Sequence, residues 1–203
     1  MVYINVSAMA LKAGPVNMKR LFDLILACIV LSFLILPMLY LAFQVRRSSS
    51  GPALYWSARI GQHNQIFMMP KYRSMFIETP EVATHLLKDS TTHITPLGAW
   101  LRRTSLDELP QLYSIIVGHM SFVGPRPALF NQDDLKQMRT KKGIHRLKPG
   151  MTGLAQINGR DEINLNEKVK LDADYLKRNN LWFDIQILWK TFLKVIKRDN
   201  IVH

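Results

Sequence analysis

The feature that most constrains this sequence is an uncharged stretch, Leu24 to Phe43, which reads LILACIVLSFLILPMLYLAF. As a helix rising about 1.5 Å per residue, a stretch of this length matches the roughly 30 Å hydrocarbon core of a bilayer. A secretory signal peptide does not fit, because the stretch is too long and the Arg46-Arg47 pair follows it in place of a small-residue cleavage site. The sequence therefore predicts a membrane segment.

Two observations bear on whether this segment crosses the bilayer. Basic pairs flank it on both sides, Lys19-Arg20 and Arg46-Arg47, whereas a spanning helix concentrates such residues on the cytoplasmic side. Pro37 interrupts the stretch and removes a backbone hydrogen bond, which bends a helix. We therefore favour a re-entrant helical hairpin over residues 18–45, and a plain spanning helix is the alternative. Asp23 follows Arg20 by one helical turn, so we expect these two to form an ion pair at the interface.

The rest of the chain is strongly basic. The formal net charge is +12, most of it after Val45, and such a surplus attracts anions: phosphorylated substrates, anionic lipids or nucleic acid. The single cysteine, Cys28, has no disulfide partner, which favours a reducing compartment. We expect a short N-terminal extension (residues 1–17), the membrane segment (18–45) and one cytoplasmic domain (46–203). The predicted fold class is α+β and mainly helical, with short β elements.

Local patterns predict several elements of that domain. Residues 53–69, around Gly61, suggest a β-hairpin, residues 79–88 a short helix that begins at Thr79-Pro80, and residues 94–103 another short element. Residues 181–198, LWFDIQILWKTFLKVIKR, fit a basic amphipathic helix that carries Trp182 and Trp189. Such a helix suits the lipid headgroup layer, and docking on the protein core fits its periodicity equally well.

Two adjacent acids, Asp107 and Glu108, carry the most suggestive chemistry. They follow Ser105 in the sequence SLDELP, where Ser105 and Glu108 have the spacing of a capping box, so we expect a helix from Ser105 to about Val117. Neighbouring helical residues point about 100° apart, so we expect the two acids to have different roles. An isolated acidic pair at a helix start has a simpler explanation, a favourable interaction with the helix dipole.

The surrounding motifs change this balance. Arg126 lies between Pro125 and Pro127, and its planar guanidinium suits a two-point contact with phosphate oxygens. The segment from Lys148 to Arg160, KPGMTGLAQINGR, combines three glycines with basic and amide side chains, and we expect its backbone to approach a ligand closely. It has neither the P-loop nor the dinucleotide-binding glycine pattern, so a kinase or a Rossmann dehydrogenase is not indicated.

Taken together, these motifs resemble the bacterial sugar transferases, small monotopic phosphoglycosyl transferases that act on polyprenyl phosphate. The resemblance covers nearly everything after Asn17 and extends to the Asp172 and Tyr175 pair. Its two central motifs, LRRTSLDELPQL and MSFVGPRP, are highly specific, whereas any one of the outer motifs alone is weak. The resemblance implies that Asp107 and Glu108 are a catalytic dyad, that Arg126 is the family's Pro-Arg-Pro arginine, and that the membrane helix is re-entrant. Longer members carry an additional N-terminal membrane domain, for which we expect no room here. At the helix break this chain has Leu36-Pro37 where members often have Ser-Pro.

The resemblance also implies a mechanism and a set of partners. Asp107 attacks the phosphate that bears the sugar of a UDP-sugar, UMP leaves, and polyprenyl (undecaprenyl) phosphate then takes the sugar phosphate from the aspartate. Mg²⁺ bound through Asp107 and the donor phosphates is the expected cofactor. The candidate phosphate-binding residues are Arg126, Arg102, Arg103, Lys148, Arg160, Gln156 and Arg73, and those of the membrane hairpin are Pro37, Arg20 and Asp23.

We further expect contact with membrane lipids at the cytoplasmic face of a bacterial inner membrane, no nucleic-acid partner, and a homodimer as one open arrangement. Two other interpretations remain. One is a non-catalytic membrane tether whose basic surface binds anionic lipid or nucleic acid. The other is a multi-spanning transferase that uses metal-bound carboxylates without a covalent intermediate, although this chain has a single candidate span.

Overall fold

The computed structural model describes residues 18–77, 79, 90–159 and 163–197. Its helices are α1 (Met18–Ser48), α2 (Pro96–Thr104), α3 (Leu112–Val117), α4 (Asp133–Lys141), α5 (Leu154–Ile157), α6 (Leu165–Arg178) and α7 (Leu181–Lys197), with 3-10 turns η1 (Gln62–Asn64), η3 (Ser90–His93), η4 (Leu106–Gln111) and η5 (Ile144–Arg146). Its strands are β1 (Leu54–Ile60), β2 (Ile66–Tyr72), β3 (Ser121–Val123), β4 (Ala128–Leu129) and β5 (Gly150–Thr152). The predicted α+β class, mainly helical, is confirmed. Of the helix predicted over residues 79–88, all but Thr79 lies outside the described residues.

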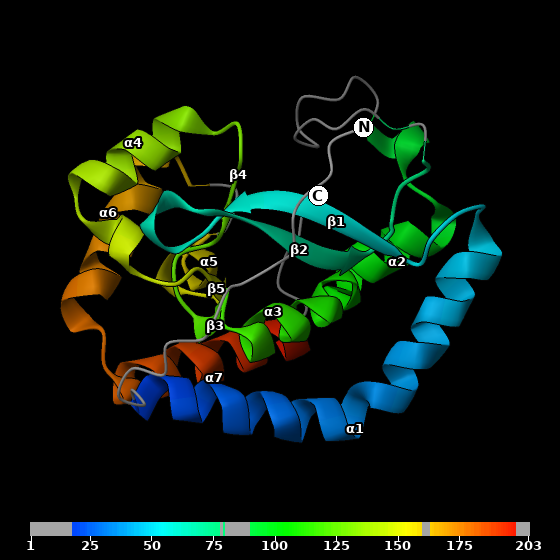
Figure 1. Cartoon of the computed structure of the whole chain (residues 1–203), viewed down its shortest axis with the longest axis horizontal. Coiled ribbons are helices and arrows are strands. Elements are labelled where there is room, and N and C mark those ends of the chain that lie inside the picture. Colours follow the sequence, from blue (N-terminus) through cyan, green and yellow to red (C-terminus); the bar gives the residue numbers. More distant parts are fainter. Residues whose placement is uncertain (1–17, 78, 80–89, 160–162, 198–203) are drawn as a thin grey trace, which may run out of the picture.

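Two small sheets form the β part. The predicted hairpin is confirmed as antiparallel β1 and β2, whose register runs from Leu54 opposite Tyr72 to Ile60 opposite Ile66, and β4 pairs with the other edge of β1. Strands β3 and β5 form a separate parallel pair, in which Ser121 lies opposite Gly150. The hairpin crosses the middle of the molecule, with α3, α7 and the first limb of α1 below it in Figure 1.

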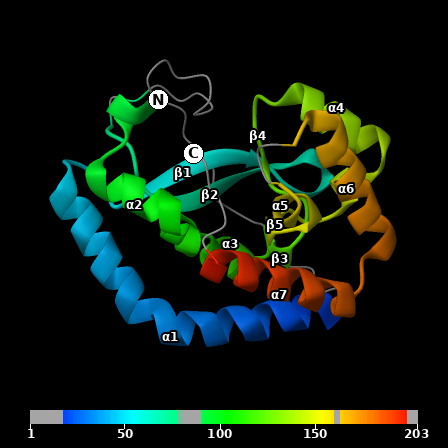
Figure 2. The ribbon, with the colours of Figure 1, turned by 180° about the vertical axis from the view of Figure 1, so that it is seen from behind.

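The long apolar helix α1 is continuous, and Pro37 lies inside it. Figures 1 and 2 show it bent: the first limb runs along α7, and the second turns away and rises toward α2. Within the described residues, α1 alone is long and apolar enough to cross a bilayer, with a mean hydropathy of 2.8 over its most apolar 18-residue window, of which 11% is buried. The predicted hairpin of two helices is therefore one bent helix in the structure.

Both limbs of α1 pack against the rest of the chain. Ala27 in the first limb is fully buried in a core cluster that includes Ile115 of α3 and Ile187 of α7. Val45 in the second limb is also fully buried, in a different cluster that includes Leu101 of α2. The two ends of the apolar helix are thus held by one and the same domain.

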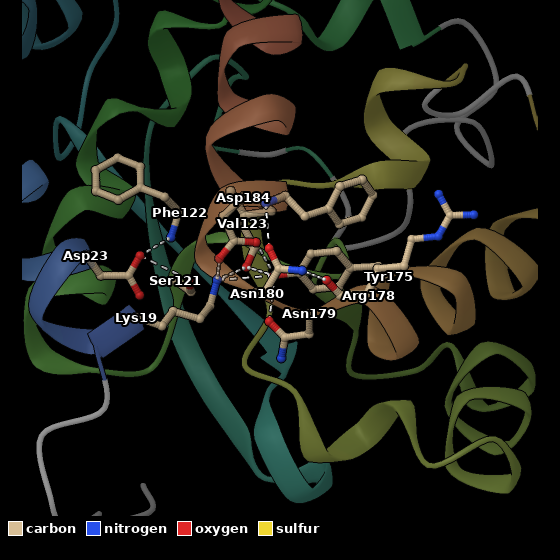
Figure 3. A network of polar contacts seen from close by, with 11 residues as sticks. Lys19, Asp23, Ser121, Phe122, Val123, Tyr175, Arg178, Asn179, Asn180 and Asp184 are labelled. Carbon is tan, nitrogen blue, oxygen red and sulfur yellow. Dashed lines mark hydrogen bonds and ion pairs between the residues drawn. The ribbon is translucent and has the colours of Figure 1, made fainter.

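Polar contacts fix the start of α1, and they correct one prediction. Asp23 does not pair with Arg20: its Oδ1 accepts from the Ser121 hydroxyl and the Phe122 N–H, each at 3.1 Å (Figure 3). Arg20 instead donates to the carbonyls of Ile115 and Ile116. Those carbonyls lie at the C-terminal end of α3, where backbone oxygens carry partial negative charge and keep capacity for a further donor. The Arg20 guanidinium binds them, and Asp23 binds Ser121 and Phe122 instead.

A second group of contacts joins α1 to α6 and α7. The Lys19 ammonium forms an ion pair with Asp184 and donates to the Tyr175 hydroxyl and to the Val123 carbonyl, each at 3.1 Å (Figure 3). Tyr175 in turn donates to Asp184 at 2.7 Å. Four segments distant in sequence therefore meet at the first turn of α1.

The C-terminal amphipathic helix is confirmed as α7, and it docks on the core. Asp184 and Ile187 are each 1% exposed on its inner face, which contacts α5, β3 and β5. On its outer face Trp182 is 69% exposed and Trp189 is 60% exposed. The helix therefore packs on the protein with one face and presents tryptophans on the other.

Candidate active site

The segment that carries the two acids is not the capped helix that the sequence suggests. Ser105 ends α2 in the left-handed conformation, with φ 57°, and its side chain caps nothing. A capping serine needs an extended backbone, so the positive φ points its hydroxyl away from the Glu108 N–H. Residues 106–111 then form the 3-10 turn η4, which contains Pro110, before α3 begins at Leu112. The predicted capping box is therefore wrong, although both acids do lie in the first turn of a helical segment.

The two acids are buried together between basic side chains. Asp107 is 7% exposed and Glu108 is 8% exposed. The Lys71 ammonium, which projects from β2, lies 2.9 Å from Glu108 Oε1 and 3.8 Å from Asp107 Oδ2. Arg126 Nη2 lies 3.4 Å from the same Glu108 oxygen. The structure thus brings the predicted dyad and the Pro-Arg-Pro arginine together, with Lys71 between the acids.

Asp107 and Glu108 differ in what holds them. Glu108 accepts hydrogen bonds from Lys71 and Arg126. Asp107 has only the longer approach of Lys71, and no hydrogen bond to its carboxylate comes from the part of the chain that the structure describes. Burial raises the pKa of the Asp107 carboxyl above its ordinary value, while Lys71 is the strongest of the charges that oppose this. The two acids thus have different surroundings, and that they have different roles stays a prediction.

A small open hollow lies beside the dyad, with Glu108 in its lining. Its lining comes from segments far apart in the sequence and is mostly polar: Arg59, Met69, Lys71, Glu108, Gln111, Arg126, Pro127, Gly150 and Met151. A buried acid beside three basic side chains suits a ligand that carries negative charge near an electrophilic centre.

Three of the other candidate arginines lie at different places. Arg102 is close enough to Asp107 for its charge to lower that carboxyl's pKa, and it donates to the Ser74 hydroxyl at 2.8 Å. Arg103 is exposed to solvent. Arg73 donates to the carbonyls of Ser49 and Ser50, which fixes the connector after α1. Arg102 therefore lies near the dyad, whereas Arg73 has a structural role in the connector after α1.

The remaining candidates lie in or near the glycine-rich segment. Lys148 lies beside Arg20 and Asp23, where burial and the Arg20 charge lower its pKa. Gln156 is 9% exposed, and its amide oxygen and nitrogen find no partner among the described residues. Arg160 lies outside the described residues. The Lys148 contacts point to the entry of α1 rather than to the dyad.

The glycines of this segment have a role that the sequence did not indicate. A Cβ on Gly150 would lie 2.1 Å from the Gly124 nitrogen, and one on Gly153 would lie 2.1 Å from the Gly124 oxygen. A Cβ on Gly124 would in turn lie 2.4 Å from the Lys148 oxygen. These glycines allow the chain after β3 to pack closely against β5 and the residues that flank it, and that this segment also approaches a ligand stays a prediction.

Sequence reasoning missed Lys71 as part of the site, although β2 carries a usable signal. Residues on alternate positions of a strand share one face, and Phe67 and Met69 are buried on the face to which Lys71 belongs. A lysine in the buried phase of a strand requires an acidic partner. Here the partner is the dyad, 36 and 37 residues further along the chain.

The side chains at this site could hold a divalent cation only together with ligands from the substrate and water. The described residues contain no group of three or more His, Cys, Asp or Glu side chains that could hold a metal ion by themselves. Mg²⁺ commonly binds through one or two carboxylates and completes its shell with water and substrate phosphates. Asp107, which accepts no hydrogen bond from a described residue, suits that arrangement.

The fold and the site define a class: a small α+β protein that has one long apolar helix and a buried carboxylate pair held among basic side chains. The family model described as "Bacterial sugar transferase" matches residues 15–198. The chain therefore belongs to the bacterial sugar transferase family.

Three relatives illustrate this membership. The undecaprenyl-phosphate galactose phosphotransferase of Salmonella typhimurium (strain LT2) is 38% identical over 198 residues, which cover 90% of this chain and 41% of that protein. The UDP-glucose:undecaprenyl-phosphate glucose-1-phosphate transferase of Escherichia coli (strain K12) is 39% identical over 186 residues, which cover 87% and 40%. The uncharacterized sugar transferase EpsL of Bacillus subtilis (strain 168) is 37% identical over 186 residues, which cover 91% and 90%. The chain thus spans about two fifths of the first two relatives and nearly all of the third.

Proposed function

We propose that this chain transfers a sugar 1-phosphate from a UDP-sugar to undecaprenyl phosphate and releases UMP. The observation that carries the proposal is the buried Asp107 carboxylate, which faces Lys71 at 3.8 Å and accepts no hydrogen bond from any described residue. Two similar relatives are named for transfer of galactose or glucose phosphate to this lipid carrier. The dyad supplies a nucleophile for such a transfer, and the basic side chains around it suit the phosphates of both substrates.

The proposed reaction has two displacements at phosphorus. In the first, an Asp107 oxygen forms a bond to the phosphorus that bears the sugar, the bond from that phosphorus to UMP breaks, and UMP leaves with the bonding electron pair. In the second, an oxygen of undecaprenyl phosphate attacks the same phosphorus, the bond to Asp107 breaks, and the lipid diphosphate sugar forms. Each nucleophile, a carboxylate or a phosphate, attacks as an anion, so neither step requires a histidine as base.

The residues around Asp107 have separate parts in this scheme. Lys71 offsets the charge of both acids and opposes the burial that raises the pKa of the Asp107 carboxyl. Arg126, held by Glu108, turns its guanidinium toward the hollow and binds the donor phosphates. Mg²⁺ bound to Asp107 and the diphosphate would neutralise charge on the leaving UMP.

The membrane part of the proposal is a re-entrant helix that enters and leaves the bilayer on the cytoplasmic face of the inner membrane. Ala27 and Val45 lie on different limbs of α1, and each is fully buried against the same domain. A straight helix whose ends lie on opposite sides of a bilayer cannot make both contacts. The exposed Trp182 and Trp189 of α7 suit the headgroup layer on that same face.

A half-reaction tests the covalent step. Purified protein is incubated with Mg²⁺ and each of a panel of UDP-sugars, including UDP-galactose and UDP-glucose, that carry a radiolabelled β-phosphate. Wild type should become labelled and release about one UMP per active site, and adding undecaprenyl phosphate should move the label to lipid. Label that reaches the lipid without ever residing on protein would instead indicate direct transfer. EDTA should stop both steps, whereas a non-catalytic tether would be indifferent to it.

A topology experiment tests the re-entrant helix. Tags at the N-terminus and the C-terminus of the full chain, probed in intact spheroplasts and after lysis, should both be protected until the inner membrane is opened. Protection of one tag only would restore the spanning helix.

A further inference from the structure

The backbone of Pro125-Arg126-Pro127 is held at three consecutive carbonyls. The Gly150 N–H donates to the Pro125 oxygen at 2.9 Å. Arg139 Nη1 donates to the Arg126 oxygen at 2.8 Å, and Arg59 Nη1 donates to the Pro127 oxygen at 3.3 Å. The prolines already fix their own φ angles, so these bonds remove most of the freedom that is left in the segment.

The hydrogen bond from Arg139 to the Arg126 carbonyl depends on a buried ion pair. Arg139 lies in α4 and is 8% exposed, and Asp172 lies in α6 and is 1% exposed. Asp172 Oδ2 accepts from Arg139 Nε at 3.0 Å and from Nη2 at 2.7 Å. Helices α4 and α6 lie side by side in both views (Figures 1 and 2) and contact each other. With Nε and Nη2 held by the acid, the plane of the guanidinium is fixed and Nη1 points at the Arg126 carbonyl.

This geometry has a consequence for the side chain of Arg126. Its carbonyl fixes the peptide plane that follows the Cα atom, and the Pro125 carbonyl fixes the plane that precedes it. The direction of the Cα–Cβ bond is then set, and with it the position from which the guanidinium reaches Glu108 at 3.4 Å. Burial of a charged pair costs free energy unless its hydrogen bonds are complete, and here three of the Arg139 donors are used.

We propose that Arg139 and Asp172 are a positioning pair that aims the Arg126 guanidinium at the donor phosphates. Neither residue faces the hollow beside the dyad, so both act through Arg126. The proposal rests on the proposed function, because it assigns Arg126 a phosphate to bind. A misplacement of about 1 Å at such a contact reduces a transfer rate by about a hundredfold.

A double-mutant cycle tests this role. The rate of UMP release is measured with whichever of UDP-galactose or UDP-glucose wild type turns over, for Arg139→Lys and Asp172→Asn in the wild-type and in the Arg126→Ala background. We expect each variant to lose about ten- to a hundredfold in kcat/KM in the wild-type background and less than about threefold when Arg126 is already absent. An equal loss in both backgrounds, or no loss in the first, would overturn the proposal.

Two further measurements separate positioning from folding. Free guanidinium ion should restore part of the rate of Arg139→Ala, because it replaces the donor to the Arg126 carbonyl. It should restore nothing in Arg139→Ala combined with Arg126→Ala, and rescue of both variants overturns the proposal.

Thr140→Val is the matched control at the next position of α4. The Thr140 hydroxyl accepts from the Asn64 side-chain amide at 3.0 Å and does not touch Arg126. This variant should keep the wild-type rate. Absence of UMP release from wild type with any donor would reject the proposed function itself, which is distinct from an active enzyme that is indifferent to Arg139.

Discussion

Two buried acidic regions of this molecule contrast in how their carboxylates are held. At the start of α1, Asp23 accepts two hydrogen bonds and Asp184 accepts bonds from Lys19 and Tyr175 (Figure 3). At the dyad, Asp107 is also buried, yet it accepts no hydrogen bond from the described residues, and its ion-pair contact among them is Lys71 at 3.8 Å. In the first region the carboxylates join distant segments through hydrogen bonds. In the second, the Asp107 carboxylate has no hydrogen bond from a described residue.

This difference in hydrogen bonding indicates which carboxylate is suited to act as a nucleophile. A carboxylate that is saturated by donors is stabilised as an anion and loses those bonds when it attacks phosphorus. One that is desolvated and lightly held is destabilised in the ground state, and burial does raise the pKa of Asp107. Removing an acid from the first region should therefore affect stability, and removing it from the second should affect rate.

The largest expected effect is on the rate of Asp107→Asn. We expect this variant to lose on the order of 10³-fold or more in transfer, because an amide cannot form the phosphoryl intermediate. Its thermal midpoint should remain within about 2 °C of wild type, since no hydrogen bond from a described residue is lost. UMP release and a thermal melt in the same detergent measure both. Normal turnover by this variant would end the nucleophile assignment.

The opposite outcome is expected for Asp184→Ala. It leaves the Lys19 ammonium and the Tyr175 hydroxyl without their acid in a buried site, which should reduce the free energy of unfolding by about 3 kcal/mol. Denaturant unfolding measures this, and Glu167→Ala, at an exposed position of α6, is the matched control. A loss no larger than that of the control would mean that this network does not hold α1 to the domain.

A third variant, Lys71→Met, sharpens the contrast through pH. In the proposed mechanism Asp107 must be ionised to attack, so we expect activity to be lost as the pH falls through its pKa. Lys71 is the strongest charge that lowers that pKa, so its removal should move the acid limb of the pH–rate profile to higher pH and reduce the neutral rate by about a hundredfold. Lys71→Arg, which keeps the charge, should leave the limb nearly in place. An acid limb that did not move with Lys71→Met would assign it to a group other than Asp107.

The sequence predicted the parts of this contrast that depend on local pattern. Alternation and turn residues predicted the β1–β2 hairpin, and helical periodicity predicted α7. The family resemblance of two motifs implied that the acids and Arg126 belong to one site, and the structure places Arg126 Nη2 3.4 Å from Glu108 Oε1. In each case the signal lies within a short stretch of chain or in a known combination of motifs.

The rest depends on contacts between distant residues. The partner of Asp23 is 98 residues away and that of Lys71 is 37 residues away, so neither spacing appears in any local window. The expected Arg20–Asp23 pair was wrong because Arg20 binds the carbonyls at the C-terminal end of α3, which come beside it only once the chain has folded. Ser105 has the capping-box spacing, but the reversal of the chain after α2 takes its backbone to a positive φ.

The smallest effect is expected for Tyr175→Phe. The lost hydroxyl donates to Asp184 at 2.7 Å, and burial together with Asp184 raises the pKa of Tyr175, so it remains a donor at any working pH. We expect a loss of about 1.5 kcal/mol in the free energy of unfolding, since Lys19 still binds both Asp184 and the Val123 carbonyl. Tyr40→Phe, on the exposed side of α1, should change stability by less than about 0.5 kcal/mol. Transfer should stay within about threefold of wild type, because β3 and the loop that follows it keep their position. A hundredfold loss of rate without a matching loss of stability would place Tyr175 in the chemistry and remove the distinction between the two regions.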